Sequence, residues 1–269
     1  MQKISACIVI YNGYEEAFAA AASVLQYTKK AALTLYLVDN ASPDGSGAAM
    51  EQAIAAGALP VSENQTVKLI CSKKNLGFGG GHNLVIPTLD SEYHFVLNPD
   101  VLVKDDVLSE MAAYATQINH TAVTKLVMAR PTLTFPDGQE QILPLRRCTV
   151  RALIYRQLPQ LKFLKRYHDR YVMQNEDRTK PVEIAFCTGS FSMLQTQSFC
   201  KMGGFDEGYF MYVEDADLTQ KAMLYGAVML LPQFQAVHAW HRAPHSNLSH
   251  FTLQIKSMVR YFKKWGFKL

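Results

Sequence analysis

Short apolar runs alternate with longer stretches of helical composition along the first half of the chain. The apolar runs have the length of strands, and each of them is followed by a polar loop. The expected strands are residues 4–10, 33–38, 67–71 and 93–97, and the expected helices are residues 15–27, 43–56 and 80–89. This alternation predicts parallel strands joined by crossover helices, with Pro43 and Asp44 in the first turn of the second helix.

The second half of the chain has a mixed pattern. We expect helices at residues 105–118, 196–202, 215–225 and 248–265, strands at 123–128 and 228–231, and a turn at 135–138. Residues 184–194 are expected to be regular, with Gly189 and Ser190 on a turn between strands. Residues 146–180 are rich in Arg and Lys with interleaved Tyr, Leu and Phe, which indicates an inserted segment. The whole pattern predicts an α/β fold with a Rossmann-like, mixed but mostly parallel sheet flanked by helices in residues 1–245, including the basic insertion, and a basic amphipathic helix in residues 246–269.

Composition narrows the class of protein. A chain of 269 residues that is 49% hydrophobic can bury the core of one catalytic domain. Its net charge of +4 is too small for a dedicated nucleic-acid-binding protein, so nucleic acid is not an expected partner. The five cysteines are scattered and form no CxxC pair, which favours a reducing compartment over a disulfide framework or a cysteine zinc site.

The apolar runs are too short for a membrane span or a signal peptide. We therefore expect a cytoplasmic protein, with any membrane contact made from one side. Clustered cations with aromatic and aliphatic neighbours in residues 146–180 and in the C-terminal tail suit a phosphorylated or lipid-linked acceptor and peripheral contact with the inner face of the cytoplasmic membrane. The alternatives are a solvated basic loop for the insertion, and a tail helix packed on the domain or at a homodimer interface.

Four polar loops follow the expected strands of the first half. In an open α/β sheet, ligands bind beyond the carboxyl ends of the strands, so chemistry is expected in these loops. They are Tyr11-Asn12-Gly13, Asp39-Asn40-Ala41-Ser42, the run from Asn75 to Asn83, and Asn98-Pro99-Asp100. The candidate site is therefore assembled from segments that lie far apart in the sequence.

Two of these loops carry a carboxylate at a strand end. Asp100 is placed to hold Mg²⁺ or Mn²⁺ against a diphosphate, because such sites take most of their ligands from phosphate and water. The alternative is that Asn98-Pro99-Asp100 forms an Asx-Pro turn that caps the next helix. Asp39 can accept a hydrogen bond from a nucleotide base while Asn40 and Ser42 cap the following helix, or it can simply end a strand.

The run from Gly77 to Gly81 is a glycine-rich loop at the start of an expected helix. Glycines allow the backbone to approach a ligand closely, which favours contact with a phosphate or a sugar. A nicotinamide-cofactor loop is the rival interpretation. The run follows the third strand rather than the first, however, and no acidic residue lies at the spacing that a dinucleotide fingerprint requires.

Acidic residues open the expected helix that follows an aromatic stretch, at Glu214, Asp215 and Asp217. The positive end of a helix in a partly apolar setting can prepare a carboxylate to act as a general base, and the alternative is ordinary capping of the helix. An earlier expected turn contains Gly189 and Ser190. These two residues either line the acceptor or diphosphate side of the cleft or form a tight connection between strands.

Three histidines, His238, His241 and His245, surround Arg242 just beyond the last expected strand. Histidine is a common metal ligand, and an arginine can balance the charge of a phosphate. We expect one of these histidines to bind metal and the others to lie near the phosphates or the acceptor.

The order and spacing of these motifs resemble the inverting glycosyltransferases of family 2, which have the GT-A fold, and more narrowly their rhamnosyltransferase-like branch. The resemblance covers nearly the whole chain. The motifs that carry it are IVIYN at 8–12, DNAS at 39–42, NLGFGGGHN at 75–83, NPD at 98–100, CTGSFSML at 187–194, GGFDEGYFMYVEDADL at 203–218, and the histidine cluster at 238–245.

The resemblance implies a role for each candidate residue. Asp39 reads the donor base, Asp100 is the metal-binding acid of the DxD position, and Asp215 of the Glu214–Asp215 pair deprotonates the acceptor hydroxyl. His238 is the first choice for a further metal ligand, with His241 and His245 as alternatives. The donor-side set is Tyr11, Asn12, Asp39, Asn75, Gly77, Gly81, Asn83, Asn98 and Asp100, and the acceptor-side set is Gly189, Ser190, Asp217 and Arg242.

Asn98 stands where many members of the family have Asp, which leaves the metal with one fewer protein charge; this form is common in the rhamnosyltransferase-like branch. The implied reaction moves L-rhamnose from dTDP-rhamnose, with inversion, to a cell-surface polysaccharide, lipopolysaccharide or lipid-linked oligosaccharide. A UDP-hexose or UDP-N-acetylhexosamine donor stays open.

Two other classes of protein fit less well. A nucleotidyltransferase needs a phosphate-gripping cation near the first strand, and the loop that begins at Tyr11 has none. A non-catalytic sugar-nucleotide-binding protein has no use for Glu214, Asp215 and Asp100 together.

Overall fold

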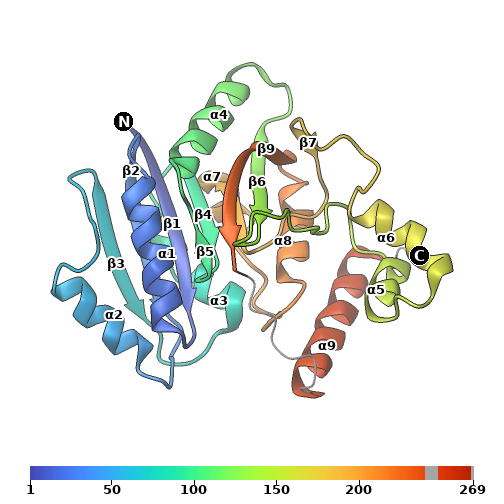
Figure 1. Ribbon diagram of the computed structural model, residues 1–269, viewed down its shortest axis with the longest axis horizontal. Coiled ribbons are helices and arrows are strands. Elements are labelled where there is room, and N and C mark those ends of the chain that lie inside the picture. Colours follow the sequence, from blue (N-terminus) through green and yellow to red (C-terminus); the bar gives the residue numbers. More distant parts are fainter. Residues whose placement is uncertain (240–247, 268–269) are drawn as a thin grey trace.

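One mixed sheet runs through the molecule, with helices on both of its faces (Figure 1). The computed structural model describes residues 1–239 and 248–267. Within them the strand order is β3-β2-β1-β4-β8-β6-β9-β5, and β7 pairs with β9. The strands are β1 Gln2–Ile10, β2 Ala31–Asp39, β3 Gln65–Cys71, β4 Tyr93–Leu97, β5 Val101–Leu102, β6 Leu126–Thr134, β7 Val182–Glu183, β8 Phe191–Gln195 and β9 Ala227–His238.

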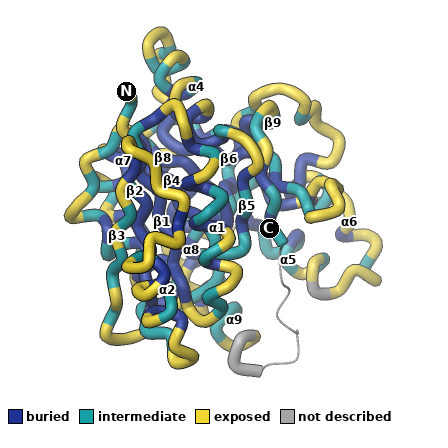
Figure 2. The backbone as a smooth tube through the Cα atoms, turned by 60° about the vertical axis from the view of Figure 1, so that its left-hand side comes forward, coloured by how far each residue is buried: buried dark blue, intermediate teal, exposed yellow. Residues whose placement is uncertain are grey.

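The helices connect these strands and cover the sheet. They are α1 Tyr14–Tyr27, α2 Ser46–Ala55, α3 Gly77–Asn83, α4 Val107–Thr121, α5 Val150–Gln157, α6 Lys165–Tyr171, α7 Thr196–Lys201, α8 Glu214–Ala222 and α9 Leu248–Trp265, with short 3₁₀ helices at Ile86–Thr88 and Lys162–Leu164. Figure 2 shows the central strands as the most buried part of the chain. None of the described helices is both long and apolar enough to span a membrane.

The N-terminal half confirms the predicted parallel strands. β1 pairs in parallel with β2 and β4, and β2 pairs in parallel with β3. All residues of β1 from Ile4 to Ile10 are buried, because helices cover both faces of the sheet, and this explains the unbroken apolar run in the sequence. The carboxyl ends of β1, β2, β3 and β4 therefore lie at the same edge of the sheet. This edge positions the candidate site.

In the second half, the turn expected at Gly189 and Ser190 is present, and within residues 184–194 regular strand structure begins only after it. Only Phe191–Gln195 forms β8, which is antiparallel to β4. The residues before it turn toward α8 instead of a neighbouring strand. The backbone N–H of Cys187 donates to Thr219 Oγ1 at 3.0 Å, and that of Gly189 donates to Asp215 Oδ2 at 3.1 Å. The last strand is also longer than expected, since β9 continues to His238.

The start of α2 corrects another expectation. Pro43 and Asp44 lie in the turn before the helix, and Asp44 Oδ1 accepts a hydrogen bond from the backbone N–H of Ser46 at 3.0 Å. The N-cap residue is Gly45, and no side chain forms a capping hydrogen bond at this end of α2. Asn40 and Ser42 therefore do not cap this helix.

The basic insertion and the C-terminal helix share a core. Helices α5, α6 and α9 lie together on the side of the molecule away from β3 (Figure 1). Ala152 from α5, Tyr171 from α6, Ala216 from α8, and Tyr261 and Phe262 from α9 belong to one buried cluster. This cluster brings the inserted segment next to the acidic residues that open α8.

Candidate active site

Hydrogen bonds join the loops that follow β1, β2 and β3. The backbone N–H of Asn12 donates to Ser42 Oγ at 3.0 Å, which links the first loop to the second. The Asn40 side-chain amide donates to Asn75 Oδ1 and to the Gly77 carbonyl, both at 3.0 Å, which links the second loop to the third. Asn40 therefore fixes the glycine loop rather than capping α2.

Asp39 ends β2 in a confined position. Its carboxylate is largely buried, and Oδ1 accepts a hydrogen bond from the backbone N–H of Ser42 at 3.2 Å. A Cβ atom on Gly47 in the first turn of α2 would lie 2.5 Å from Asp39 Oδ2, so only glycine leaves room for this carboxylate. Asp39 is thus held beside the exposed loop of Tyr11 and Asn12, as a base-reading residue requires.

The glycine loop is shaped by contacts with protein. Gly77 has φ +75°, and a Cβ atom there would collide with the carbonyl oxygen of Phe210. The next residue, Phe78, donates its backbone N–H to that same oxygen at 3.2 Å. The loop is therefore locked to the aromatic stretch that leads to α8.

Two expected donor-binding residues have structural roles instead. Gly81 packs α3 against β1, since a Cβ atom there would lie 2.8 Å from Val9 Cγ1. The Asn83 side chain bonds the backbone N–H of Phe205 at 2.9 Å and its carbonyl oxygen at 3.0 Å, and it also donates to Glu207 Oε1. Both residues hold α3 in place through these contacts.

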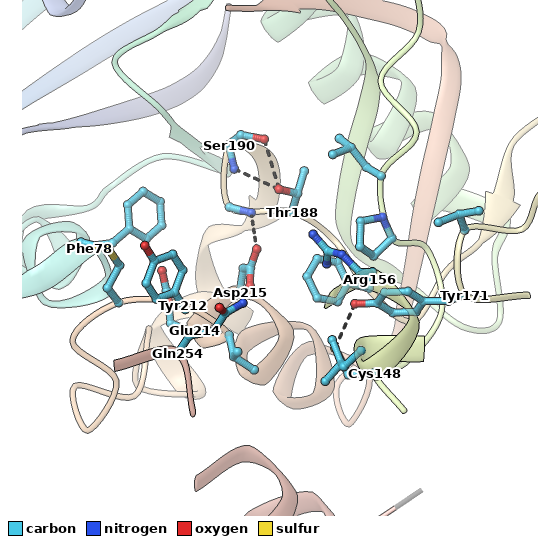
Figure 3. Close-up of a pocket in the computed structure, with 18 of the residues that line it drawn as sticks. Phe78, Cys148, Arg156, Tyr171, Thr188, Ser190, Tyr212, Glu214, Asp215 and Gln254 are labelled. Atoms are coloured by element: carbon cyan, nitrogen blue, oxygen red, sulfur yellow. Dashed lines mark hydrogen bonds between the residues drawn. The ribbon is translucent and has the colours of Figure 1, made fainter. Parts of the chain in front are cut away.

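A pocket of about 520 Å³ brings the remaining candidates together (Figure 3). Expected residues in its lining are Asn98, Asp100, Gly189, Ser190, Glu214, Asp215 and His238. Tyr11, Asn12, Asp39, Asn75 and Gly77 lie outside this lining, in the joined loops at the carboxyl edge of β1 to β3. The site therefore has two parts: the joined loops and the pocket.

Asp100 and His238 face each other in the pocket wall. Asp100 Oδ1 lies 3.3 Å from His238 Nε2, and both side chains are largely buried. The pairing of β5 with β9 sets this geometry, because Val101 is in register with His238. His238 Nδ1 lies 3.0 Å from Gln141 Oε1, and Gln141 Nε2 donates to the His238 carbonyl at 2.7 Å.

These contacts fit a metal site in which the protein supplies few ligands. A hydrogen bond from Nδ1 to Gln141 fixes the ring and leaves Nε2 as a ligand atom beside the Asp100 carboxylate. In residues 1–239 and 248–267, no group of three or more His, Cys, Asp or Glu side chains could hold a metal ion. The alternatives His241 and His245, and the acceptor-side Arg242, lie outside the described residues.

Glu214 and Asp215 open α8 at the pocket and have different surroundings. Burial, then the charge of Asp215, raises the pKa of Glu214 to about 8. Burial also raises the pKa of Asp215, but this carboxylate accepts hydrogen bonds from the backbone N–H of Gly189 at 3.1 Å and of Ala216 at 2.8 Å, which lower it. Asp215 is therefore the member of the pair that ionises first, and Glu214 stays protonated near neutral pH.

The backbone before this pair is strained. Tyr212 and Val213 have φ of +70° and +69°, in the left-handed region that a β-branched residue such as valine rarely adopts. Such conformations persist where the surrounding structure enforces them, and they concentrate at functional sites. Here they reverse the chain between the aromatic stretch and α8, so that Tyr212, Glu214 and Asp215 all line the pocket.

Asp217 does not face the pocket. Its carboxylate is fully buried against α9, where it bonds Lys264 Nζ at 2.9 Å and Trp265 Nε1 at 2.7 Å. Only Ala216 separates it from Asp215 along α8, so its side chain points to a different face of the helix. The expectation of an acceptor-side role is therefore wrong for Asp217.

Several pocket residues were not predicted as site residues. Arg156, His168 and Tyr171 come from the inserted segment, and the basic composition of residues 146–180 was their only sequence signal. Phe78 and Tyr212 stood inside recognised motifs, but nothing in the sequence showed that both rings line one pocket.

The chain belongs to glycosyl transferase family 2, since the profile of that family matches residues 5–203. The resemblance to its rhamnosyltransferase-like branch is confirmed by two relatives. The chain is similar to rhamnosyltransferase WbbL of Escherichia coli K12, with 26% identity over 199 residues that cover 70% of each chain. It is also similar to an N-acetylglucosaminyl-diphospho-decaprenol L-rhamnosyltransferase of Mycobacterium tuberculosis, with 24% identity over 225 residues that cover 78% of this chain and 67% of the relative.

Solved structures confirm the GT-A fold. The chain superimposes on GalNAc-T7, crystallised with UDP, GalNAc and Mn²⁺, with a TM-score of 0.68 and 13% sequence identity. The match covers 98% of this chain and 48% of that one, so the chain spans about half the length of that structure. At this identity the likeness shows the fold alone.

Proposed function

We propose that this glycosyltransferase moves L-rhamnose from dTDP-rhamnose, with inversion, onto a glycan or lipid-linked glycan of the cell surface. The two relatives named as rhamnosyltransferases support the sugar and the kind of acceptor. The observation that carries the proposed chemistry is the Asp215 carboxylate, which is fixed by Gly189 and Ala216 in the same pocket as Asp100 and His238. A UDP-hexose or UDP-N-acetylhexosamine is the alternative donor for the same machinery.

Asp215 acts as the general base. The acceptor hydroxyl loses its proton to Asp215 while its oxygen forms a bond to the anomeric carbon, from the face opposite the nucleotide. The bond between that carbon and the diphosphate oxygen breaks with its electron pair, so the diphosphate leaves with additional negative charge. Glu214 stays protonated beside the base, which keeps a second negative charge out of the pocket.

Asp100 and His238 hold the metal ion, Mg²⁺ or Mn²⁺. A divalent cation held by these two residues would neutralise charge on the diphosphate of the donor. Asn98 lines the same wall, and its backbone N–H donates to the Ser190 carbonyl at 2.9 Å, which fixes the turn that carries Asp100. His241, His245 and Arg242 stay candidates for further contacts with the metal or the phosphates.

The donor nucleotide lies along the joined loops. Asp39 accepts a hydrogen bond from the base, and Tyr11, Asn12, Asn75 and Gly77 form the surface that contacts the nucleotide. The hydrogen bonds among these loops support this assignment, because they keep the surface rigid before the donor binds.

We further propose that the enzyme works in the cytoplasm, on the inner face of the cytoplasmic membrane. Phe251, Ile255 and Val259 form an exposed apolar stripe on α9, and Lys256 and Lys263 lie beside it. Apolar side chains next to lysines suit the surface of an anionic bilayer. Met258 and Gln254 of the same helix line the pocket, so the stripe adjoins the acceptor side. A homodimer is the alternative use of this surface.

A donor screen tests the proposal. Purified protein is mixed with Mn²⁺ or Mg²⁺ and with dTDP-rhamnose, UDP-glucose, UDP-galactose or UDP-N-acetylglucosamine, and thermal stabilisation and nucleotide release are measured. We expect selective stabilisation by dTDP-rhamnose that depends on the metal and is lost in Asp100→Ala and His238→Gln. Selective stabilisation by a UDP-sugar would show that the donor is that sugar nucleotide and not dTDP-rhamnose. Thermal stabilisation without release of the nucleotide, whichever acceptor is added, would indicate a non-catalytic sugar-nucleotide-binding protein.

A further inference from the structure

Arg156 is the lone arginine or lysine among the described residues that line the pocket. It belongs to α5 of the basic insertion and points into the pocket beside Asp215 (Figure 3). The three acidic residues in the same lining are Asp100, Glu214 and Asp215. Asp100 and Asp215 would repel a negatively charged substrate group unless a cation received it.

The Arg156 side chain has no structural partner that accounts for its position. Within residues 1–239 and 248–267 it forms no salt bridge or hydrogen bond, and the residue is exposed. Arg151 on the same helix differs, since its guanidinium donates to Tyr167 Oη at 2.9 Å and lies over that ring. The charge of Arg156 acts on the nearby Asp215, whose pKa it lowers, but the guanidinium N–H groups make no hydrogen bond within the described residues and are available to a ligand.

The position of Arg156 points to the acceptor rather than the donor. The donor loops follow β1, β2 and β3, whereas α5 lies on the opposite side of the molecule (Figure 1). Phe78, from the loop after β3, and Arg156 lie on opposite sides of Asp215 (Figure 3). Because the base must face the acceptor hydroxyl, the space beyond Asp215 on the Arg156 side belongs to the acceptor.

The walls around Arg156 describe the rest of this ligand. Leu153 lies one turn before Arg156 on α5, and Ile142, Leu143, Pro144 and Met258 add apolar side chains to the same pocket lining. His168 also lines the pocket, and burial lowers the pKa of His168, so it adds a neutral hydrogen-bonding ring rather than a second charge. A cation surrounded by apolar side chains matches an anionic group that is joined to a hydrocarbon chain.

We propose that Arg156 binds a phosphate group of the acceptor, so that the basic insertion forms a subsite for acceptors in which the sugar is linked to an alkyl chain through a diphosphate. This assignment rests on the proposed function, because it takes Asp215 as the base that faces the acceptor. The arginine suits this role since its planar guanidinium binds two phosphate oxygens at once.

Two synthetic acceptors with the same alkyl chain test the subsite. One is an N-acetylglucosaminyl diphosphate ester, and the other is the neutral alkyl N-acetylglucosaminide. Arg156→Gln should raise the KM of the diphosphate acceptor at least tenfold and leave the KM of the donor and the KM of the neutral acceptor unchanged. Arg156→Lys should recover part of the loss, and Arg151→Gln on the same helix is the matched control.

Calorimetry separates this proposal from the proposed function. Binding of the alkyl diphosphate acceptor to the donor-free protein needs no turnover, so it reports on Arg156 even when no donor is used. We expect the wild type to bind and Arg156→Gln to bind at least tenfold more weakly. Equal binding by both proteins, or equal losses on the charged and neutral acceptors, would overturn the subsite while leaving the transferase reaction intact.

Discussion

The two neighbouring carboxyl groups at the start of α8 differ in the hydrogen bonds they receive, and this difference divides their roles. Asp215 accepts two backbone N–H groups, while Glu214 Oε2 is buried and has no hydrogen-bond partner among the described residues. Backbone donors stabilise a carboxylate, and burial without donors stabilises the neutral acid. The strained Val213 brings both groups to the pocket at once.

Asp215→Asn should abolish transfer and spare donor binding. The amide keeps the size of the side chain but cannot take a proton, so kcat should fall by about 1000-fold, as is usual when a general base is lost. The donor dissociation constant should stay within twofold, because the donor loops are untouched. Asp177→Asn, at an exposed site outside the pocket, is the control for initial-rate and binding measurements. Normal turnover by Asp215→Asn would remove this residue from the base role.

Glu214→Gln should change how stability depends on pH. The carboxyl group has an ordinary pKa of 4.5, and folding raises this pKa to about 8. Between these values the unfolded chain has lost the proton that the folded protein keeps, so wild-type stability falls as pH rises through this range. Glutamine cannot ionise, and the variant should gain several degrees in Tm relative to wild type between pH 5 and pH 8. A Tm difference independent of pH, as expected for the exposed Glu63→Gln, would contradict the assignment.

At the scale of elements, the parallel half of the sheet could be predicted from the sequence. Strands buried on both faces have unbroken apolar runs, and the polar loops after them are easily seen. Helix α9 was also predicted with its observed bounds, Leu248–Trp265. Elements that depend on distant partners were predicted less closely. Residues 184–194 were expected to be regular around a turn at Gly189 and Ser190, but only the part from Phe191 forms a strand, because residues before it bond to α8.

The same distinction applies to the site. Asp100, Asp215 and His238 were predicted because motif residues at strand and helix ends have few alternative positions. Gly81, Asn83 and Asp217 belong to the same motifs but serve packing, and only tertiary contacts with Val9, Phe205 and Lys264 reveal this. Arg156 lies in a segment whose composition marked it as basic, while its placement depends on how α5 packs against α8 and α9.

Helix α9 is held to the domain through a buried charge, and this contact supports the acceptor side of the pocket. Asp217 bonds Lys264 and Trp265, and Lys264 also bonds Asp206. Asp217→Asn should lower the free energy of unfolding by about 2 kcal/mol. Loss of one partner of a fully buried ion pair would lower this free energy further, but Lys264 is partly exposed. Chemical denaturation measures this change.

Loosening of α9 should have a selective effect on catalysis. Gln254 and Met258 line the pocket from this helix, so Asp217→Asn should raise the acceptor KM several-fold and leave the donor KM unchanged. Lys263→Gln on the exposed side of α9 is the control. Equal losses for donor and acceptor would show that α9 supports the whole domain rather than the acceptor side.

At the scale of the whole molecule, the fold places the donor loops and the acceptor pocket on opposite sides of Asp215. Joined loops at the carboxyl edge of β1 to β3 receive the nucleotide, while α5, α6 and α9 enclose the other end of the pocket. The exposed stripe of α9 lies beside that second end. An acceptor anchored in a bilayer could therefore enter the pocket while the donor loops stay open to water.

This arrangement predicts binding to anionic vesicles through α9. In flotation assays the protein should rise with vesicles that contain phosphatidylglycerol and stay unbound with pure phosphatidylcholine. Replacing Phe251, Ile255 and Val259 together by serine should lower the bound fraction at least tenfold, because the stripe supplies the apolar contact. Turnover of a water-soluble acceptor should be unchanged.

The control for the stripe is a triple serine variant at Val61, Val123 and Leu224, which are also exposed apolar residues but lie far apart in the sequence. It removes a similar amount of exposed apolar surface without touching α9, so it should float like the wild type. If the stripe is instead a dimer interface, the α9 variant will change the mass measured by light scattering and leave flotation unaffected. If α9 docks on the membrane, the α9 variant will lose vesicle binding in flotation while its mass in light scattering stays unchanged. A dimer interface would not give this combination.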